Sequence, residues 1–265
     1  MVTARSCWGA LPGIRTQTVR KRRSRHCSQG AFRLRAAAAT RDWCSWSARR
    51  LPGLLRAAQA TWDHALGDDR TRAASLLSRA LAVTGQQQIR LSKEPIASVA
   101  TDRAARYAEA AGDPIAAAEA ARAQAIVLRR TGSPVADQVM VFAAERLCAA
   151  TGLAQAAAAG MYARILASAA YTAAGHDDRD TAAEYLAAAR GAIAPWGDAP
   201  YMPKVDLDVY VVSCDRVLGD HGAALHHAGR STSTRFPTLT RRAGTGRTSP
   251  SPPTAGAAST SPSRP

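Results

Sequence analysis

Apolar residues in the middle of the chain recur with the spacing of an α-helix. Between residues 51 and 228 they fall three or four positions apart, and most of them are Ala, Leu, Val or Ile. Charged and polar residues fill the intervening positions. The clearest stripes are Ala73, Leu76, Leu77, Ala80 and Leu81; Tyr162, Ile165, Leu166, Ala169, Ala170 and Ala173; Ala182, Tyr185, Leu186, Ala189 and Ile193; and Leu207, Tyr210, Val211, Cys214 and Leu218. This pattern predicts an all-α domain.

Helix-breaking residues divide this region at regular intervals. Gly112-Asp113-Pro114 supplies a helix stop, an N-cap and a proline for the first helical position, and Gly132-Ser133-Pro134 repeats that order. Gly152 and Gly175 continue the spacing of about 20 residues. Helices of about 17 residues joined by tight turns pack as antiparallel neighbours, and a pair has the length of an α-solenoid repeat. We therefore expect an α-solenoid of antiparallel helix pairs.

The first helix is expected over Leu54–Leu66, with a stop at Gly67 and a cap from Asp68 or Asp69. The helix that follows runs on past Gly85 to Leu91. An irregular segment is expected at residues 195–203, where three prolines and a glycine are incompatible with a continuous helix.

Charge separates the two ends of the chain from the middle. Residues 1–50 carry 12 Arg or Lys and one acid, and residues 229–265 carry six Arg and no acid. Residues 51–228 have a net charge of −2, although the whole chain has +15. A phosphate-binding face on the helical domain is therefore not supported. The Ser/Thr/Pro/Arg-rich tail at 229–265, and most of residues 1–50, are expected to be disordered.

Several other function classes lack support in the sequence. No apolar run is long enough for a membrane span, and no apolar segment follows the basic stretch at residues 20–25 as a signal peptide would require. The five cysteines lack pairing spacings, which favours a reducing cytoplasm. No phosphate-binding glycine loop, nucleophile elbow or metal-binding motif is present, so we expect no enzyme activity and no cofactor. The pair His226-His227 diverges by about 100° on a helix and is expected to be solvated.

A group of short segments carries a family resemblance. They are Trp62–Gly67, Val99–Ala104, Ala108–Pro114, Gly160–Arg164, Asp180–Ala182, Val205–Tyr210 and Leu218–Gly222. With them, residues 54–227 resemble the C-terminal tetratricopeptide-like domain of actinobacterial helix-turn-helix (XRE-type) transcriptional regulators. The resemblance implies a tetratricopeptide-like fold and a role in binding a peptide, a protein or a small-molecule effector.

The chain departs from that family at both ends. Residues 1–50 have no set of short amphipathic helices that could form the DNA-binding domain, and the repeats stop near residue 228. The resemblance therefore implies contact with DNA only through a helix-turn-helix domain that is missing here. The abundance of Arg and absence of Asn suggest GC-rich DNA, and we hypothesise that one or both ends are read out of frame.

Five residues are candidates for ligand or partner binding. Trp196, Tyr201 and Met202 are large apolar groups on the proline-rich loop, where they either form a binding lip or fill the gap between adjacent helices. Tyr162 and Arg164 could line a concave groove, although Tyr162 also falls on an apolar stripe.

The favoured interpretation is the sensor or interaction domain of a cytoplasmic transcriptional regulator, truncated or frameshifted. Its effector would act by shifting helix packing or the dimerisation of two copies. Two alternatives remain open: a free-standing helical-repeat scaffold, and a nucleic-acid binder acting through the basic tails, in which Trp43 and Trp46 could stack on bases.

Overall fold

The computed structural model describes residues 41–230, with side chains from Arg49 onward. Over this range the backbone forms nine α-helices and one short 3₁₀ helix, and its only β-type pairing is an isolated bridge between Ala199 and Met202. The prediction of an all-α domain is confirmed for these residues. The helices are α3 (Arg41–His64), α4 (Gly67–Arg90), α5 (Glu94–Ala111), α6 (Pro114–Arg130), α7 (Ala136–Thr151), α8 (Ala156–Gly175), α9 (Arg179–Ile193), η1 (Ala194–Trp196), α10 (Lys204–Val217) and α11 (His221–Arg230).

Several predicted boundaries are confirmed by the backbone. Gly112 ends α5 in the left-handed conformation (φ +58°), Asp113 caps α6, and Pro114 is its first residue. Gly152 ends α7 in the same way, and α8 ends at Gly175. The stretch between α9 and α10 lacks α-helix, as its prolines predict.

Other boundaries differ from the prediction. The first helix begins at Arg41, well before Leu54, and continues through Pro52. Helix α4 begins at Gly67 itself, so Asp68 and Asp69 lie in its first turn and form no cap. Negatively charged side chains are favoured in the first turn because the amino end of a helix carries partial positive charge.

The turn after α6 also differs in detail. Gly132 has the expected positive φ of +76°, but α7 begins only at Ala136, and its N-cap residue is Val135. Valine has no side-chain acceptor for the free amide groups, so the predicted cap by Ser133 was wrong.

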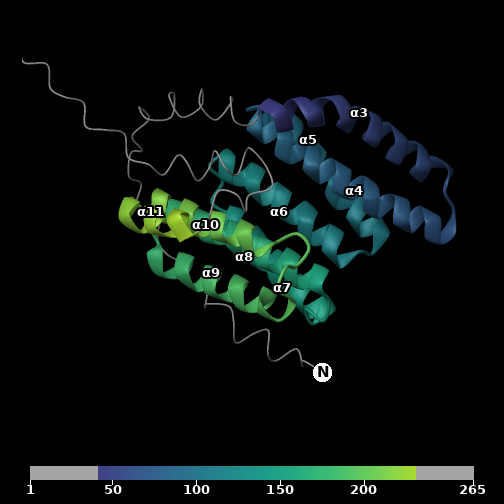
Figure 1. Cartoon of the computed structure of the whole chain (residues 1–265). Coiled ribbons are helices and arrows are strands. Elements are labelled where there is room, and N and C mark those ends of the chain that lie inside the picture. Colours follow the sequence, from purple (N-terminus) through teal and green to yellow (C-terminus); the bar gives the residue numbers. More distant parts are fainter. Residues whose placement is uncertain (1–40, 231–265) are drawn as a thin grey trace, which may run out of the picture.

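Helices that are adjacent in sequence lie side by side, and alternate helices also pack together (Figure 1). Helix α4 contacts α6, α6 contacts α8, and α8 contacts α10. The purple and blue helices α3–α5 lie at one end of the molecule, the yellow-green α10 and α11 at the other, and α6–α8 between them. None of the helices within residues 41–230 combines the length and apolarity needed to cross a membrane.

Helix α8 is buried along most of its length. Its residues Met161, Ile165 and Leu166 are at the centre of the largest core cluster, with contributions from α7, α9, α10 and the loop before α10. A second cluster joins α4, α5 and α6, mainly through alanines packed around Leu77 and Leu81. Alanine lets helix axes approach closely, so this half of the molecule is held by close contact of small side chains.

Candidate functional site

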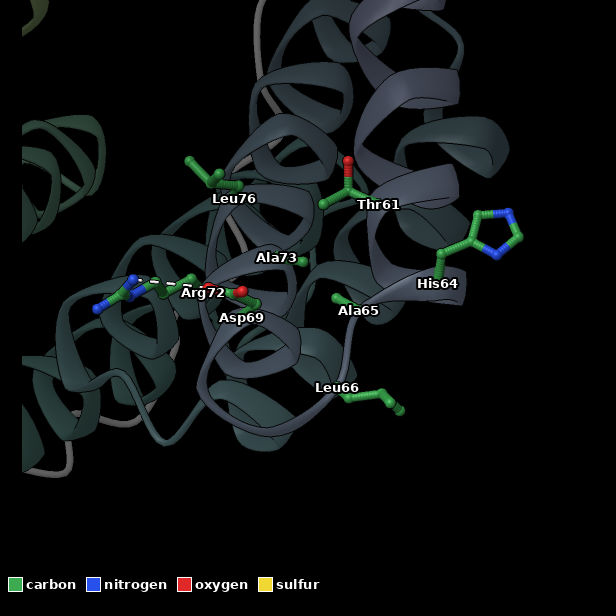
Figure 2. Close-up of a pocket in the computed structure, with 8 residues that line it drawn as sticks. All are labelled: Thr61, His64, Ala65, Leu66, Asp69, Arg72, Ala73 and Leu76. Atoms are coloured by element: carbon green, nitrogen blue, oxygen red, sulfur yellow. Dashed lines mark ion pairs between the residues drawn. The ribbon is translucent and has the colours of Figure 1, made fainter.

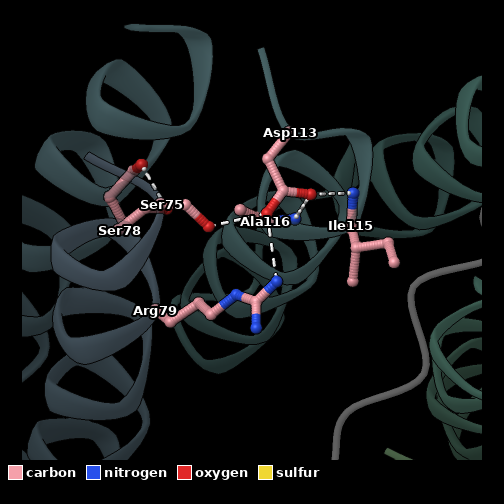
Figure 3. Close-up of polar contacts among 7 residues, drawn as sticks. Ser75, Ser78, Arg79, Asp113, Ile115 and Ala116 are labelled. Atoms are coloured by element: carbon pink, nitrogen blue, oxygen red, sulfur yellow. Dashed lines mark hydrogen bonds and ion pairs between the residues drawn. The ribbon is translucent and has the colours of Figure 1, made fainter. Parts of the chain in front are cut away.

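Two groups of polar side chains connect the alternating helices α4, α6, α8 and α10. The first is centred on Asp113, the N-cap residue of α6 (Figure 3). One carboxylate oxygen accepts hydrogen bonds from the amides of Ile115 and Ala116 at 2.9 and 3.1 Å. The other oxygen accepts from Ser75 Oγ at 2.6 Å and from Arg79 Nη2 at 3.0 Å. A single side chain therefore caps α6 and ties it to α4.

These partners control the ionisation of Asp113. Burial alone raises the pKa of its carboxyl group, because a charge is poorly solvated inside the protein. The hydrogen bonds from Ser75 and from the Ala116 and Ile115 amides, together with the positive charge of Arg79, outweigh burial and lower the pKa below 3.8. The carboxylate is therefore ionised at neutral pH.

The second group connects α6, α8 and α10 through Arg122. Its Nε donates to Ser168 Oγ at 2.8 Å, and its Nη2 donates to the Tyr210 hydroxyl at 3.1 Å. The two hydroxyl oxygens are 3.1 Å from each other, within hydrogen-bonding distance. Arg122 is only 4% exposed. A buried guanidinium thus holds two neutral hydroxyl groups where a carboxylate would commonly be found.

Arg129 extends this group by two helical turns. Its Nη1 donates to Thr172 Oγ1 at 3.0 Å and to the Ser168 carbonyl at 3.4 Å, and its guanidinium lies over the Tyr171 ring at 5.1 Å. Burial is the main cause that lowers the pKa of Arg129, and the charge of Arg122 acts in the same direction. The two guanidinium groups are therefore close enough to repel each other.

The arginines also affect Tyr210. Burial raises the pKa of its hydroxyl, but the charges of Arg122 and Arg164 and the hydrogen bonds from Ser168 and Arg122 lower it to about 8. The phenolate form is stabilised because it would offset the positive charge of the surrounding arginines.

Two of the predicted binding residues belong to the core. Tyr162 is 2% exposed and Met202 is 1% exposed, and both lie in the cluster around α8. Desolvation raises the pKa of Tyr162 to about 12, so its hydroxyl is neutral at physiological pH. Met202 fills the space between helices, which is the second of the two roles considered for this loop, and Trp196 is 39% exposed.

Tyr201 and Arg164 lie nearer to the polar groups. The half-buried ring of Tyr201 has the Arg79 guanidinium 5.9 Å from its centre, which connects the loop to α4. Burial raises the pKa of Tyr201, and the charge of Arg164 on α8 opposes that rise; the same charge helps to lower the pKa of Tyr210. These two candidates therefore lie on the side of the molecule where the polar groups meet.

Sequence reasoning missed Arg122 and Ser168 as a pair and assigned Tyr210 only to an apolar stripe. One signal was available for Arg122, because it occurs between Ala118 and Ala125 at the spacing of one helix face, and both alanines are buried. A charged residue in phase with core alanines indicates a buried polar contact. Nothing local identifies its partners, which lie 46 and 88 residues further along the chain.

The surface also has an open hollow of about 580 Å³ where α3 meets α4 (Figure 2). Its lining is mainly apolar and includes Ala65, Leu66, Ala73 and Leu76. Leu66 is 81% exposed and Leu76 is 62% exposed. Leu76 belongs to the apolar stripe predicted for this helix but does not contribute to the core of the described structure.

The histidines near the end of α11, His226 and His227, contact each other, and His227 also contacts Asp215. His227 Nδ1 contacts Asp215 Oδ2 at 2.7 Å, and its ring lies edge-on to that of His226. Between residues 41 and 230, no three His, Cys, Asp or Glu side chains come together in a way that could hold a metal ion.

Comparisons with protein-family models, with curated proteins and with solved structures found no match to this chain. The resemblance to helix-turn-helix regulators therefore stays a prediction from the sequence.

Proposed function

We propose that this chain is a tetratricopeptide-like solenoid of antiparallel helix pairs, which binds a peptide, a protein or a small-molecule effector as the sensor domain of a transcriptional regulator. The observation that carries the proposal is the contact series α4–α6–α8–α10. In a solenoid of helix pairs, the first helices of successive repeats pack on one another and form a continuous face. Such a face is the usual ligand-binding surface of these folds.

The distribution of polar residues supports the same assignment. Arg79 projects from α4, Arg122 from α6, Ser168 from α8 and Tyr210 from α10, so each helix of the series contributes to one of the two polar groups. These interactions connect one helix of the series to another. A ligand that rearranges them would shift one repeat against the next, which provides a way to transmit binding along the solenoid.

The test is a thermal-shift screen of the full 265-residue chain against organic acids, nucleotides and peptides, followed by calorimetry on each hit. We expect a hit whose affinity falls at least about tenfold in Arg164→Ala, a loss typical of a charged hydrogen bond. Arg146→Ala is the matched control, because Arg146 lies over the ring of exposed Phe142 on α7. Equal losses in the two variants would contradict a site on this face.

The regulatory part needs a separate measurement. When the full chain is placed behind a heterologous helix-turn-helix domain that needs dimerisation, we expect reporter transcription to respond to the identified ligand. A ligand that binds with full affinity but leaves the reporter unchanged would remove the regulatory role and keep the binding role.

A scaffold function is the second candidate, and the hollow between α3 and α4 is the observation that favours it. Exposed leucines rimmed by Asp69 and Arg72 form the type of surface that packs against another protein. Under this alternative, Leu66→Ser together with Leu76→Ser would abolish partner binding and leave small-molecule binding unchanged. The third alternative, nucleic-acid binding by the tails, falls on residues outside those that the structure describes, apart from Trp43 and Trp46 in α3, whose side chains are not described.

A further inference from the structure

Two positive charges of α6 converge on one turn of α8. Arg122 and Arg129 are seven residues apart, which places them on the same face of the helix. Both donate to Ser168, Arg122 to its hydroxyl and Arg129 to its carbonyl, and Arg129 also donates to Thr172. All these acceptors are uncharged.

Neither guanidinium forms an ion pair with a carboxylate within the described part of the chain. Asp137 lies near enough to Arg129 to influence its pKa, but its own carboxylate contacts His176 at 3.4 Å. The remaining nitrogen of Arg122, Nη1, is buried and lacks a hydrogen-bond partner in residues 41–230. A buried cationic donor without an acceptor is costly, so this position has an unmet requirement for a negatively charged oxygen.

We propose that the face formed by α6, α8 and α10 binds the carboxylate or phosphate group of a small-molecule ligand, with Arg122 Nη1 as the principal donor and Arg129 as the second cation. This inference rests on the proposed binding function, because it names the chemistry of the ligand. An anionic oxygen at Nη1 would complete the hydrogen bonding of Arg122. It would also reduce the repulsion between the two guanidinium groups.

The burial of the cluster determines the size of the ligand. Arg122 is 4% exposed, whereas nucleic acid is bound through a row of accessible cations that follow its backbone. Arg129 and Tyr210 are only half-buried, so the cluster approaches the surface on their side. A compact anionic group on a small molecule fits this arrangement. The Ser168 hydroxyl donates to the Arg164 carbonyl at 2.8 Å and is within hydrogen-bonding distance of the Tyr210 hydroxyl, so the two guanidinium groups are the donors for the ligand.

The test uses the full chain and measures its melting temperature in sodium chloride, sodium phosphate and sodium succinate at pH 7 and equal ionic strength. We expect a saturable rise with phosphate, with succinate or with both, and the comparison identifies which group the site prefers. In Arg122→Met the apparent affinity should fall about 10- to 100-fold, as expected for loss of a charged hydrogen bond. Arg146→Met removes the same charge from the surface and should behave as the wild type.

The matched control is needed because phosphate stabilises many proteins without binding to a site. Such general stabilisation would appear equally in both variants and would not saturate. A rise that does not saturate, or one that persists in Arg122→Met, would overturn the inference. We expect Arg122→Met to fold, because the Ser168 and Tyr210 hydroxyls can still bond to each other. If it does not fold, Arg129→Met at its half-buried position takes its place, with an expected loss of several-fold.

A second readout separates ligand binding from a purely structural role of Arg122. An anion beside the arginines would offset the charge that holds down the pKa of Tyr210, so tyrosinate absorbance should appear at higher pH when the anion is bound. An unchanged tyrosinate titration at saturating anion would contradict the site. If these anions have no effect while a screened ligand still requires Arg164, this inference fails and the proposed binding function remains.

Discussion

The two halves of the helical region achieve close packing in different ways. Around α4 and α5, alanines and Gly85 bring the helices together, and a Cβ at Gly85 would lie 2.5 Å from a methyl group of Thr101. Around α8, alanines share the interior with large side chains such as Met161, Ile165 and Leu166, and a Cβ at Gly160 would lie 1.7 Å from the carbonyl oxygen of Pro200. The first half therefore depends on the short distance between helices α4 and α5. The second depends on the volume of the buried side chains around α8 and on the contact of the loop between α9 and α10 with α8.

Removing volume at the centre of α8 should have the largest effect. Leu166→Ala deletes a fully buried side chain surrounded by other large residues, and we expect it to lower the free energy of unfolding by about 2–5 kcal/mol. Leu76→Ala is the matched control in the other half, and its exposed position predicts a change within about 0.5 kcal/mol. Urea denaturation measures both. Similar losses in the two variants would mean that the burial described for α8 is wrong.

The two close glycines allow a direct comparison of the halves. Gly160→Ala forces a side chain against a backbone carbonyl and should cost about 1–3 kcal/mol. Gly85→Ala meets the methyl group of Thr101 instead of a backbone atom, and the higher helix propensity of alanine offsets about 0.5–1 kcal/mol, so its net cost should be smaller. Gly191→Ala has open space in α9 and should stabilise the protein slightly. A lower melting temperature for Gly85→Ala than for Gly160→Ala would contradict this distinction.

The contact between α4 and α6 should have an intermediate effect. Asp113→Ala removes an N-cap and the acceptor of Ser75 and Arg79, with an expected loss of about 1–2 kcal/mol. Asp69→Ala, at an exposed helix start without a cap, should change stability by less than about 0.5 kcal/mol.

The lowered pKa of Asp113 also predicts that the stability of the protein depends on pH in the acidic range. The carboxyl group has a lower pKa in the folded protein than the ordinary value of 3.8, so the unfolded chain binds the proton more tightly. The stability that it contributes is fully present above the unfolded pKa and is lost as the pH falls through the lowered folded value. The difference in stability between the wild type and Asp113→Ala should therefore narrow in this acidic range, and a constant difference would count against the assignment.

At neutral pH the shifted pKa of Tyr210 contributes the least to stability, because its hydroxyl keeps its proton there in both the folded and the unfolded chain. Its pKa of about 8 is below the ordinary value of 10, so this tyrosine should ionise before Tyr162, whose pKa is about 12. The sign of the linkage makes stability rise between about pH 8 and pH 10, because the unfolded chain still holds the proton there. Absorbance near 295 nm should show an early step of tyrosinate formation that is absent in Tyr210→Phe. An identical titration in both proteins would disprove the shift.

Local sequence signals predicted the helices better than they predicted the polar contacts. Gly112, Asp113 and Pro114 act through their own backbone geometry and nearest amides, so neighbouring residues were sufficient to identify that boundary. The additional bonds of Asp113 to Ser75 and Arg79 cross 38 and 34 residues, and no periodic pattern encodes them.

The proline-rich loop between α9 and α10 shows what its own composition can and cannot predict. Its composition predicts an irregular segment, and the structure contains one. Composition does not reveal that the loop folds back on α8, where Met202 enters the core. Whether its exposed residue Trp196 binds anything is still a prediction.

The contact of Pro200 with Gly160 has a consequence for recognising distant relatives of this chain. A relative with any larger residue at the position of Gly160 would need a connection of different length or path between α9 and α10, because the carbonyl of Pro200 occupies that space. The two sites should therefore change together during divergence. Joint retention of the glycine and the loop length would provide a criterion for kinship where overall identity has faded.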